Sequence, residues 1–349
     1  MPNAPSSAAN TVVIVGAGIV GLLTARELVK RRWRVTVIER GELAREASWA
    51  GGGILCPLYP WREPQAVWDL AQRSLRLYPT LIDELERGTG VATGYLQSGL
   101  RYHDEAESAE ARAWVARAGV PAIAQRIEPS GSLPAASRCS FAWVHQVRNP
   151  RLCQALIADL RSRGVELAAG EAIERMLVSG NRVAGVATSK RQLPVAQVCI
   201  CAGAWSADLL AATGWRLPIA PVRGQMLLLR TASPAPDTIV VSRGLYLIPR
   251  ERDLVLVGST VEHAGFQSGT TEEARASLLA GAIAIAPALR EARVEGHWAG
   301  LRPGSPDGVP FVGAHPELVN LWVNAGHYRN GLTLAPASAL QLAELIGEA

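Results

Sequence analysis

The chain has 349 residues, with 35 Lys and Arg against 31 Asp and Glu and a formal net charge of +4. At about 150 residues a domain, this length corresponds to one or two domains. A content of 48% hydrophobic and 19% charged residues is typical of a globular protein with a sizeable core. The arginines are scattered, so we expect neither a basic nucleic-acid-binding arm nor an acidic tail.

No apolar stretch is long enough for a membrane-spanning helix. The two longest, residues 12–23 and 276–289, fall short of the roughly 20 residues that cross a bilayer. The first ten residues lack the positive charges of a secretory signal. The cysteines are odd in number and have no disulfide-framework spacing: Cys56, Cys139, Cys153, Cys199 and Cys201. We therefore expect free thiols, a cytoplasmic location, and neither a membrane nor a nucleic-acid partner.

The N-terminal part of the chain predicts a β-α-β unit. Thr11–Val15 and Val35–Glu39 are β-branched runs typical of buried strands, and Ile19–Lys30 between them has helical spacing. Strands that alternate with helices favour a parallel sheet, so an α/β domain is expected.

The middle of the chain predicts loops, helices and a β-meander. A long loop covers Gly51–Gly53 and Cys56–Pro64, and short strands with turn signals fill Val165–Cys201. Asn149 is expected as an N-cap with Pro150 at the first helical position. Helices are expected over three ranges: Ala66–Arg87, interrupted near Pro79; Glu105–Ala118; and Arg151–Arg163.

The second half predicts a strand-rich region and a return to the first sheet. Strands are expected at Val222–Arg230, Ile239–Val241, Gly244–Pro249, Leu254–Ser259 and Leu321–Asn324, and helices at Glu272–Ala286 and Pro336–Ile346. Because strands of two sheets interleave along the chain, both domains are expected to be discontinuous.

Gly16, Gly18 and Gly21 form a G-x-G-x-x-G motif between the first strand and the first helix. Such glycines permit a tight turn, the approach of backbone amides to a pyrophosphate, and close packing of helix on strand. Glu39 ends the second strand, where an acid accepts hydrogen bonds from a ribose. The alternative is a glycine-rich turn without a ligand, but the surrounding elements favour dinucleotide binding. Only one such motif occurs, which disfavours a second nicotinamide site.

Three further segments carry polar groups among glycines: Tyr246 in residues 244–250, Arg302 in residues 298–304 and Arg329 in residues 326–331. A guanidinium matches a carboxylate in bidentate geometry, so the two arginines suit recognition of an anion. From composition alone, a pair of surface arginines is the alternative. Cys199 and Cys201 lack partner ligands for a metal, so we interpret them as core thiols.

These motifs together resemble the FAD-dependent D-amino-acid oxidase superfamily, and within it the glycine oxidases of thiamine biosynthesis. The segments that carry the resemblance are Val12–Arg40, Ala47–Leu55, Cys201–Ser206, Tyr246–Arg250, Gly296–Val312 and Gly326–Pro336. The resemblance implies a Rossmann-like FAD-binding domain and a second, antiparallel-sheet substrate domain. It assigns the FAD-binding domain to residues 11–85, 145–220 and 300–349, and the substrate domain to residues 86–144 and 221–299. Residues 1–10 are expected to be a flexible N-terminus.

The resemblance also implies which residues hold the cofactor. The fingerprint would hold the pyrophosphate through Gly16, Gly18, Ile19, Val20 and Gly21, and Glu39 with Arg40 the adenosine ribose. Ala47 and Gly51, Gly52 and Gly53 would pass close to the flavin, and Ile173 would meet the adenine through its backbone. The pyrimidine side of the flavin would face His327, Tyr328, Arg329, Asn330, Gly331, Leu332 and Thr333. Sarcosine oxidases of this superfamily anchor FAD through a cysteine late in the chain. Here the last cysteine is Cys201, so non-covalent FAD is expected.

The activity that the resemblance implies is oxidative deamination of glycine, through the imine, to glyoxylate, ammonia and hydrogen peroxide, with oxygen as acceptor and the imine serving thiazole assembly. Arg302, Tyr246 and Arg329 would bind the substrate, and no side chain is assigned as an acid–base catalyst because hydride passes to flavin N5. Three alternatives stay open: oxidation of sarcosine or small D-amino acids, a dehydrogenase that reduces a quinone, and a catalytically inert flavin-binding protein. The sequence also leaves open a homo-oligomer.

Overall fold

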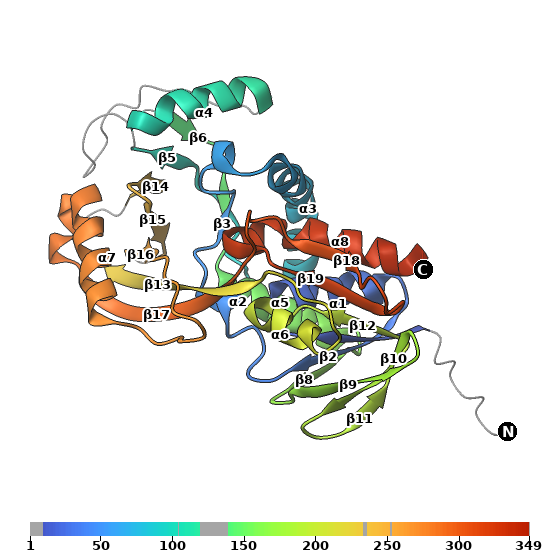
Figure 1. Cartoon of the computed structure of the whole chain (residues 1–349). Helices are drawn as coiled ribbons and strands as arrows, with labels where there is room; N and C mark the ends of the chain where they lie inside the picture. The colour runs from blue at the N-terminus through green and yellow to red at the C-terminus, as the bar shows by residue number, and fades with distance from the viewer. Residues whose placement is uncertain (1–9, 104, 119–138, 233–235, 252, 349) are drawn as a thin grey trace.

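The computed structural model describes residues 10–103, 105–118, 139–232, 236–251 and 253–348. Residues 1–9 of the expected flexible N-terminus lie outside this range. Figure 1 shows two sheets side by side, one at the left and one at the lower right.

A six-stranded sheet carries the N-terminal β-α-β unit. Its order is β18 (Phe311–Ala314), β19 (Leu321–Ala325), β12 (Gln197–Ile200), β1 (Thr11–Val15), β2 (Arg34–Glu39) and β8 (Glu166–Ala169). The pairings are parallel except that of β18 with β19. This confirms the expected parallel sheet. Strand β12 pairs with β1 from the N-terminal end of the chain and with β19 from the C-terminal end, so the sheet closes only when the whole chain has folded.

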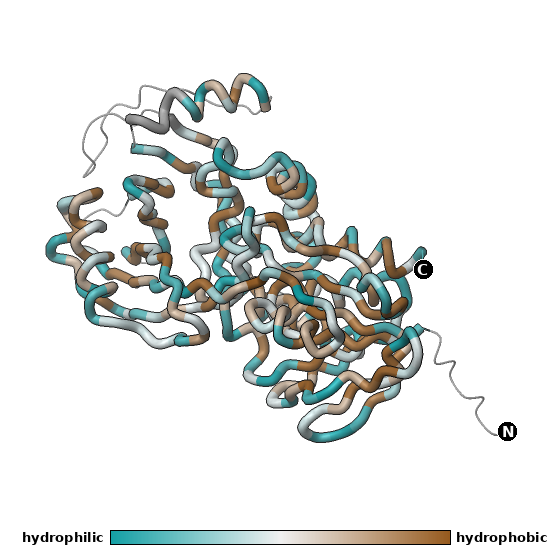
Figure 2. Tube along the Cα trace, viewed as in Figure 1, coloured by the Kyte–Doolittle hydropathy of each residue, from teal (hydrophilic) through white to brown (hydrophobic). Residues whose placement is uncertain are grey.

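Both faces of this sheet are buried, because alternate residues of β1 enter two separate cores. Val12 and Ile14 pack with helices on one face, and Val13 and Val15 pack toward the other. The helices of the first face are α1 (Ile19–Lys30), α3 (Gln65–Thr89), α5 (Asn149–Ser162) and α8 (Gly331–Glu348). The second face is covered by α6 (Ser206–Ala211) and by the sheet of β9 (Ile173–Ser179), β10 (Arg182–Thr188) and β11 (Gln192–Pro194). Figure 2 shows hydrophobic residues concentrated in these central strands.

A seven-stranded sheet forms the second layer. Its order is β17 (Arg293–Gly304), β13 (Ala220–Arg230), β16 (Leu254–Gly258), β15 (Leu245–Arg250), β14 (Ile239–Ser242), β5 (Leu100–Tyr102) and β6 (Cys139–Phe141). All pairings are antiparallel except that of β14 with β5. Helix α7 (Glu272–Ile285) packs on one face. The strands of the two sheets interleave along the sequence, as expected. The exact residue ranges of the two domains stay a prediction.

Three short strands form a further small sheet, in the order β3 (Ile54–Leu55), β7 (His145–Gln146) and β4 (Leu96–Gln97). The remaining elements are the helices α2 (Ala47–Ala50) and α4 (Glu105–Ala118) and the 3-10 turns η2 (Pro60–Arg62), η3 (Gly203–Trp205), η4 (Pro287–Glu291) and η5 (Tyr328–Asn330). The expected β-meander over Val165–Cys201 is only partly correct, because β8 and β12 at its ends belong to the parallel sheet.

Two expected helix boundaries are wrong, and both involve proline. Helix α3 runs without interruption through Pro79, because its apolar face is buried in the core and packing outweighs the local cost of proline. Helix α8 begins at Gly331 rather than near Pro336. Pro336 has no N–H for the carbonyl of Leu332, and the hydroxyl of Tyr78 on α3 donates to that carbonyl instead, at 2.6 Å. The tertiary contact therefore lets the helix start five residues earlier.

The expected N-cap of α5 is also wrong. Asn149 is the first helical residue, and Arg148 occupies the cap position without a side-chain hydrogen bond. The Asn149 amide instead donates to the carbonyl of Ser48 on α2, at 2.9 Å. A long-range contact has replaced the local one.

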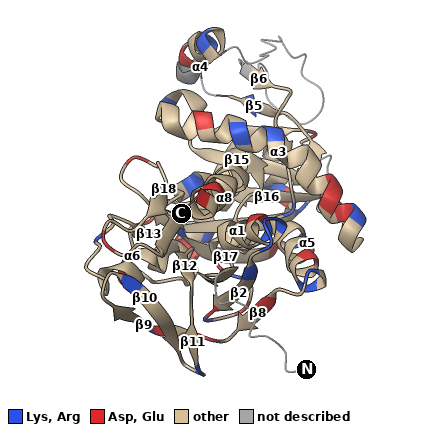
Figure 3. Ribbon diagram, turned by 90° about the vertical axis from the view of Figure 1, so that its right-hand side faces the viewer, with Lys and Arg blue, Asp and Glu red and all other residues tan. Residues whose placement is uncertain are grey.

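The charged residues form no continuous basic stripe in the view of Figure 3, where blue and red segments intersperse over α3 and α5. Among the described residues, no helix combines the length and apolar character needed to span a bilayer. The described residues also hold no cluster of three or more His, Cys, Asp or Glu side chains suited to a metal ion.

Candidate active site

The glycine fingerprint occupies the carboxyl end of β1, at the point where neighbouring strands lead to opposite sides of the sheet. Gly16 has a φ of +105°, and a Cβ there would collide with the carbonyl of Cys201. A Cβ at Gly21 would collide with the carbonyl of Gly16. Only glycine fits at these two positions, so α1 approaches β1 closely and its N-terminus opens toward the crevice where α/β folds bind nucleotides.

Glu39 lies beside the fingerprint at the end of β2. Its carboxylate accepts hydrogen bonds from the amides of Ala17, at 2.9 Å, and Gly41, at 3.1 Å. The adjacent Arg40 places its guanidinium 3.6 Å from the ring centre of Trp205, a residue of η3. The two side chains meet from β2 and from the turn after β12, across the crevice.

Ser48 on α2 occupies the N-terminus of α1. Its Oγ accepts a hydrogen bond from the amide of Ile19, at 2.8 Å, because the N-cap residue Gly18 has no side chain for this role. Ser48 is not among the residues found from the sequence. Its signal was the small-residue segment around Ala47, but no local pattern shows that this segment meets α1.

The glycine loop Gly51–Gly53 is fixed between the two sheets. Gly53 has a φ of +77° and no room for a Cβ against the carbonyl of Val147. The guanidinium of Arg250 donates to the carbonyl of Gly52 at 2.5 Å. Burial lowers the pKa of Arg250 to about 9, and Arg148 acts in the same direction. The guanidinium of Arg250, which is partly buried, therefore holds the loop through the carbonyl of Gly52.

Arg302 lies on β17 with its charge uncompensated by any carboxylate in the described part of the chain. Its guanidinium donates to Oγ of Ser259 at 2.6 Å and to the carbonyl of Thr260 at 3.2 Å. Burial lowers its pKa from the usual value, and Tyr246 lies close enough to oppose that shift. Tyr246 itself is buried and donates to Sδ of Met226 at 3.3 Å. Two of five guanidinium donors are thus used on neutral acceptors.

The turn before α8, residues 327–330, lines a cavity together with Arg302. His327 is 1% exposed, and its Nε2 lies 3.0 Å from Oγ of Ser338. Burial lowers the pKa of His327 to about 3, so the imidazole is neutral at physiological pH. Asn330 donates to Glu63 at 3.2 Å, which ties this turn to the loop after β3. Burial raises the pKa of Glu63, although Asn330 and Arg329 act to lower it. Arg329 is exposed at the rim.

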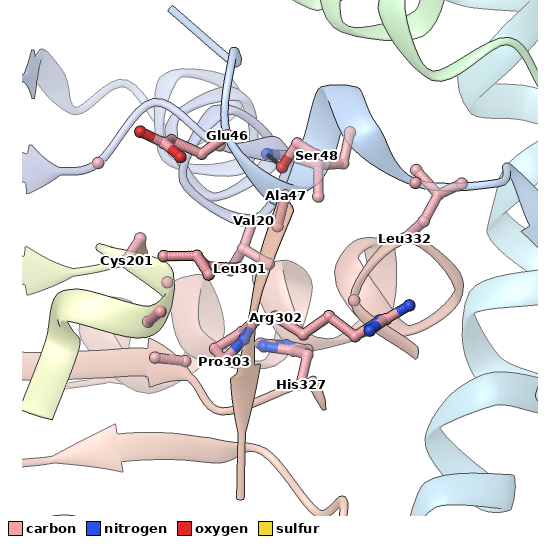
Figure 4. A pocket seen from close by; sticks show the side chains of 18 of the residues that line it. Val20, Glu46, Ala47, Ser48, Cys201, Leu301, Arg302, Pro303, His327 and Leu332 are labelled. Carbon is pink, nitrogen blue, oxygen red and sulfur yellow. Dashed lines mark hydrogen bonds between the residues drawn. The ribbon is translucent and has the colours of Figure 1, made fainter. Parts of the chain in front are cut away.

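One cavity of about 490 Å3 connects these groups. Figure 4 shows Glu46, Ala47 and Ser48 on one side and Arg302, Pro303 and His327 on the other. Every site residue expected from the sequence lines the cavity except Gly21, which packs beneath it. Lining residues that the sequence did not reveal include Glu46, Ser48, Glu63, Asn149, Glu171 and Trp205. They come from distant segments that meet only in the folded chain.

A cavity that runs from a glycine fingerprint to an uncompensated arginine is built for a dinucleotide beside an anion, and comparison with known proteins agrees. The family described as FAD dependent oxidoreductase (DAO) matches residues 11–345. The chain belongs to this family. Its expected fold class is therefore confirmed, and FAD is its cofactor.

Named relatives match along nearly the whole chain. A glycine oxidase of Pseudomonas aeruginosa is 44% identical over 96% of this chain and 94% of its own. A bifunctional ThiO/ThiG protein of Trichormus variabilis is 32% identical over 97% of this chain and 52% of its own. The crystal structure of glycine oxidase from Geobacillus kaustophilus superposes with a TM-score of 0.89, at 30% identity, and covers 97% of this chain and 94% of its own.

The residues present fit FAD. Gly16 and Gly21, where a Cβ would collide with backbone, form the turn that a pyrophosphate approaches. Glu39 supplies acceptor oxygens for ribose hydroxyls, and the N-terminus of α1 favours negative charge. The described cysteines, Cys56, Cys153, Cys199 and Cys201, are free and buried. Burial raises the pKa of Cys201 to about 12, which fits an inert core thiol.

Proposed function

We propose that this chain is an FAD-dependent glycine oxidase that converts glycine, oxygen and water to glyoxylate, ammonia and hydrogen peroxide. The observation that carries the proposal is Arg302: a partly buried guanidinium on the cavity wall whose bonds go only to neutral acceptors, among the described residues. Withdrawing a cation from water without an anion is costly. A substrate carboxylate supplies the missing charge.

Within the proposal, bound FAD supplies the chemistry of accepting a hydride from the substrate Cα and passing electrons to oxygen. Arg302 binds the carboxylate, with Tyr246 turning its hydroxyl from Met226 toward the same group. Arg329 at the rim attracts the anionic end of the substrate. His327 stays neutral and holds the turn through Ser338. The amine must be neutral to release hydride, and we assign no side chain as its base.

The similarity to the two glycine oxidases above supports glycine as the substrate. The similarity to the ThiO/ThiG protein supports a role in supplying thiazole assembly. We infer a cytoplasmic enzyme, because the free buried thiols suit a reducing compartment. The first test is an absorption spectrum before and after anaerobic addition of glycine, followed by aeration. Bleaching, then recovery with hydrogen peroxide, is expected. Parallel assays with sarcosine, D-alanine and D-proline decide the substrate, and no bleaching by any amine would refute the proposal.

The carboxylate assignment has its own test. Arg302→Ala should keep FAD bound but weaken the binding of glycine by about 1.5–3 kcal/mol, the range for hydrogen bonds to charged groups. This corresponds to a KM that is about 10- to 150-fold higher. Arg293→Ala is the matched control, because it removes an exposed arginine at the other end of β17, and it should keep the wild-type KM. If Arg302→Ala has wild-type kinetics, Arg302 does not bind the substrate.

A further inference from the structure

One short segment, residues 259–260, holds the guanidinium of Arg302 and lies outside the cavity lining. Ser259 accepts through Oγ and Thr260 through its carbonyl, and neither residue lines the cavity. On its other side the guanidinium packs against Gly224 of β13, where a Cβ would collide with both Nη atoms. The position of residues 259–260 therefore sets the position of the charge.

Residues 259–260 are themselves fixed by side chains further from the cavity. Oγ1 of Thr260 accepts a hydrogen bond from the amide of Gln225 at 2.8 Å and donates to Oε1 of Glu262. Gln225 is fully buried, and its Nε2 donates to the same Oε1 at 2.9 Å. Glu262 thus ties Thr260 to β13.

Glu262 is neutralised by a different arginine. Arg223 on β13 donates to Oε2 of Glu262 through Nε, at 2.9 Å, and also through Nη2. The backbones of Arg223 and Glu262 exchange two hydrogen bonds of 2.9 Å each. Burial acts to raise the pKa of Glu262, but the bonds from Thr260, Arg223 and Gln225 hold it below the usual value. The carboxylate is therefore ionised and saturated with donors.

The strand register keeps the two arginines apart. On the paired strands β13 and β17, Val222 lies opposite Arg302 and Arg223 opposite Leu301. Successive side chains of a strand point to opposite faces. The carboxylate of Glu262 is therefore bound to Arg223, and the guanidinium of Arg302 donates only to neutral acceptors.

We propose that Glu262 is a positioning residue that fixes Ser259 and Thr260, and through them orients the guanidinium of Arg302 for a carboxylate ligand. The inference rests on the proposed function, in which Arg302 binds the substrate carboxylate. Glu262 does not touch the substrate. Its loss lets residues 259–260 move and weakens carboxylate binding without changing the cofactor site.

The test compares FAD-loaded Glu262→Ala, Glu262→Gln and Arg302→Ala, with Glu273→Gln on the exposed start of α7 as matched control. The readouts are KM and kcat for glycine, FAD affinity, and the Kd of acetate from its perturbation of the flavin spectrum. Glu262→Ala should raise both KM and the acetate Kd about tenfold, with kcat within about twofold, which corresponds to the loss of one well-placed hydrogen bond. Glu262→Gln keeps an acceptor for Thr260 and should lie between Glu262→Ala and wild type.

The outcomes separate the two proposals. If Arg302→Ala leaves KM and the acetate Kd unchanged, the proposed function of Arg302 fails. If Arg302→Ala weakens both ligands but Glu262→Ala does not, the positioning role is refuted. A Glu262→Ala protein that loses FAD affinity with unchanged acetate Kd also refutes it. Should Glu262→Ala not fold, Thr260→Val removes the same link while it keeps the carbonyl, and an unchanged acetate Kd would then overturn the inference.

Discussion

His327 should make the folded protein sensitive to mild acid. Burial lowers its pKa to about 3 in the folded chain, whereas an exposed histidine has a pKa of about 6.5. Between these values the unfolded chain binds a proton that the folded chain refuses, so stability rises with pH. The stabilisation is complete above about pH 6.5 and is lost progressively as the pH falls toward the folded value.

The magnitude follows from the two pKa values. At pH 5 an unfolded histidine is stabilised by protonation by about 2 kcal/mol, and the folded His327 gains almost nothing there. The apo-protein should therefore lose about 2 kcal/mol of unfolding free energy between pH 8 and pH 5 through this residue alone. Other titrating groups contribute as well, so the measurement is a difference against a variant.

The assay is urea unfolding of apo wild type and apo His327→Gln at pH 8 and pH 5. Glutamine retains an amide that reaches Ser338 and does not titrate. The pH-dependent loss should be smaller in His327→Gln by about 2 kcal/mol. His263→Gln, at an exposed histidine, is the control and should behave as wild type. Equal pH dependence in His327→Gln and wild type would show that the buried imidazole titrates normally, and the argument would be wrong.

Two further substitutions test the packing around the cofactor site. Gly16→Ala should abolish FAD binding in a titration followed by flavin fluorescence, because the new Cβ meets the carbonyl of Cys201 at a φ of +105°; retained affinity would show that this turn is not the pyrophosphate site. Tyr78→Phe leaves the carbonyl of Leu332 without a donor and should cost about 1–3 kcal/mol in urea unfolding. An unchanged midpoint would mean that Pro336 is tolerated without this hydrogen bond.

The sequence by itself determined the elements whose causes are local. The β-branched run Thr11–Val15, the helix Ile19–Lys30 and the glycine fingerprint between them are fixed by periodicity and by steric limits at Gly16 and Gly21. The site residues taken from the family resemblance came to one cavity, apart from Gly21, because that resemblance spans the whole chain.

Tertiary structure decided what depends on contacts between distant segments. The start of α8 was set by Tyr78, 254 residues away from Leu332, and Asn149 was drawn from its cap position by Ser48. Ser48 at the N-terminus of α1, Glu63 beside Asn330, and Glu262 behind Arg302 carry no motif of their own. Each is a polar group whose partner lies on another element, and hydrogen-bond partners over such separations are chosen by packing rather than by local propensity.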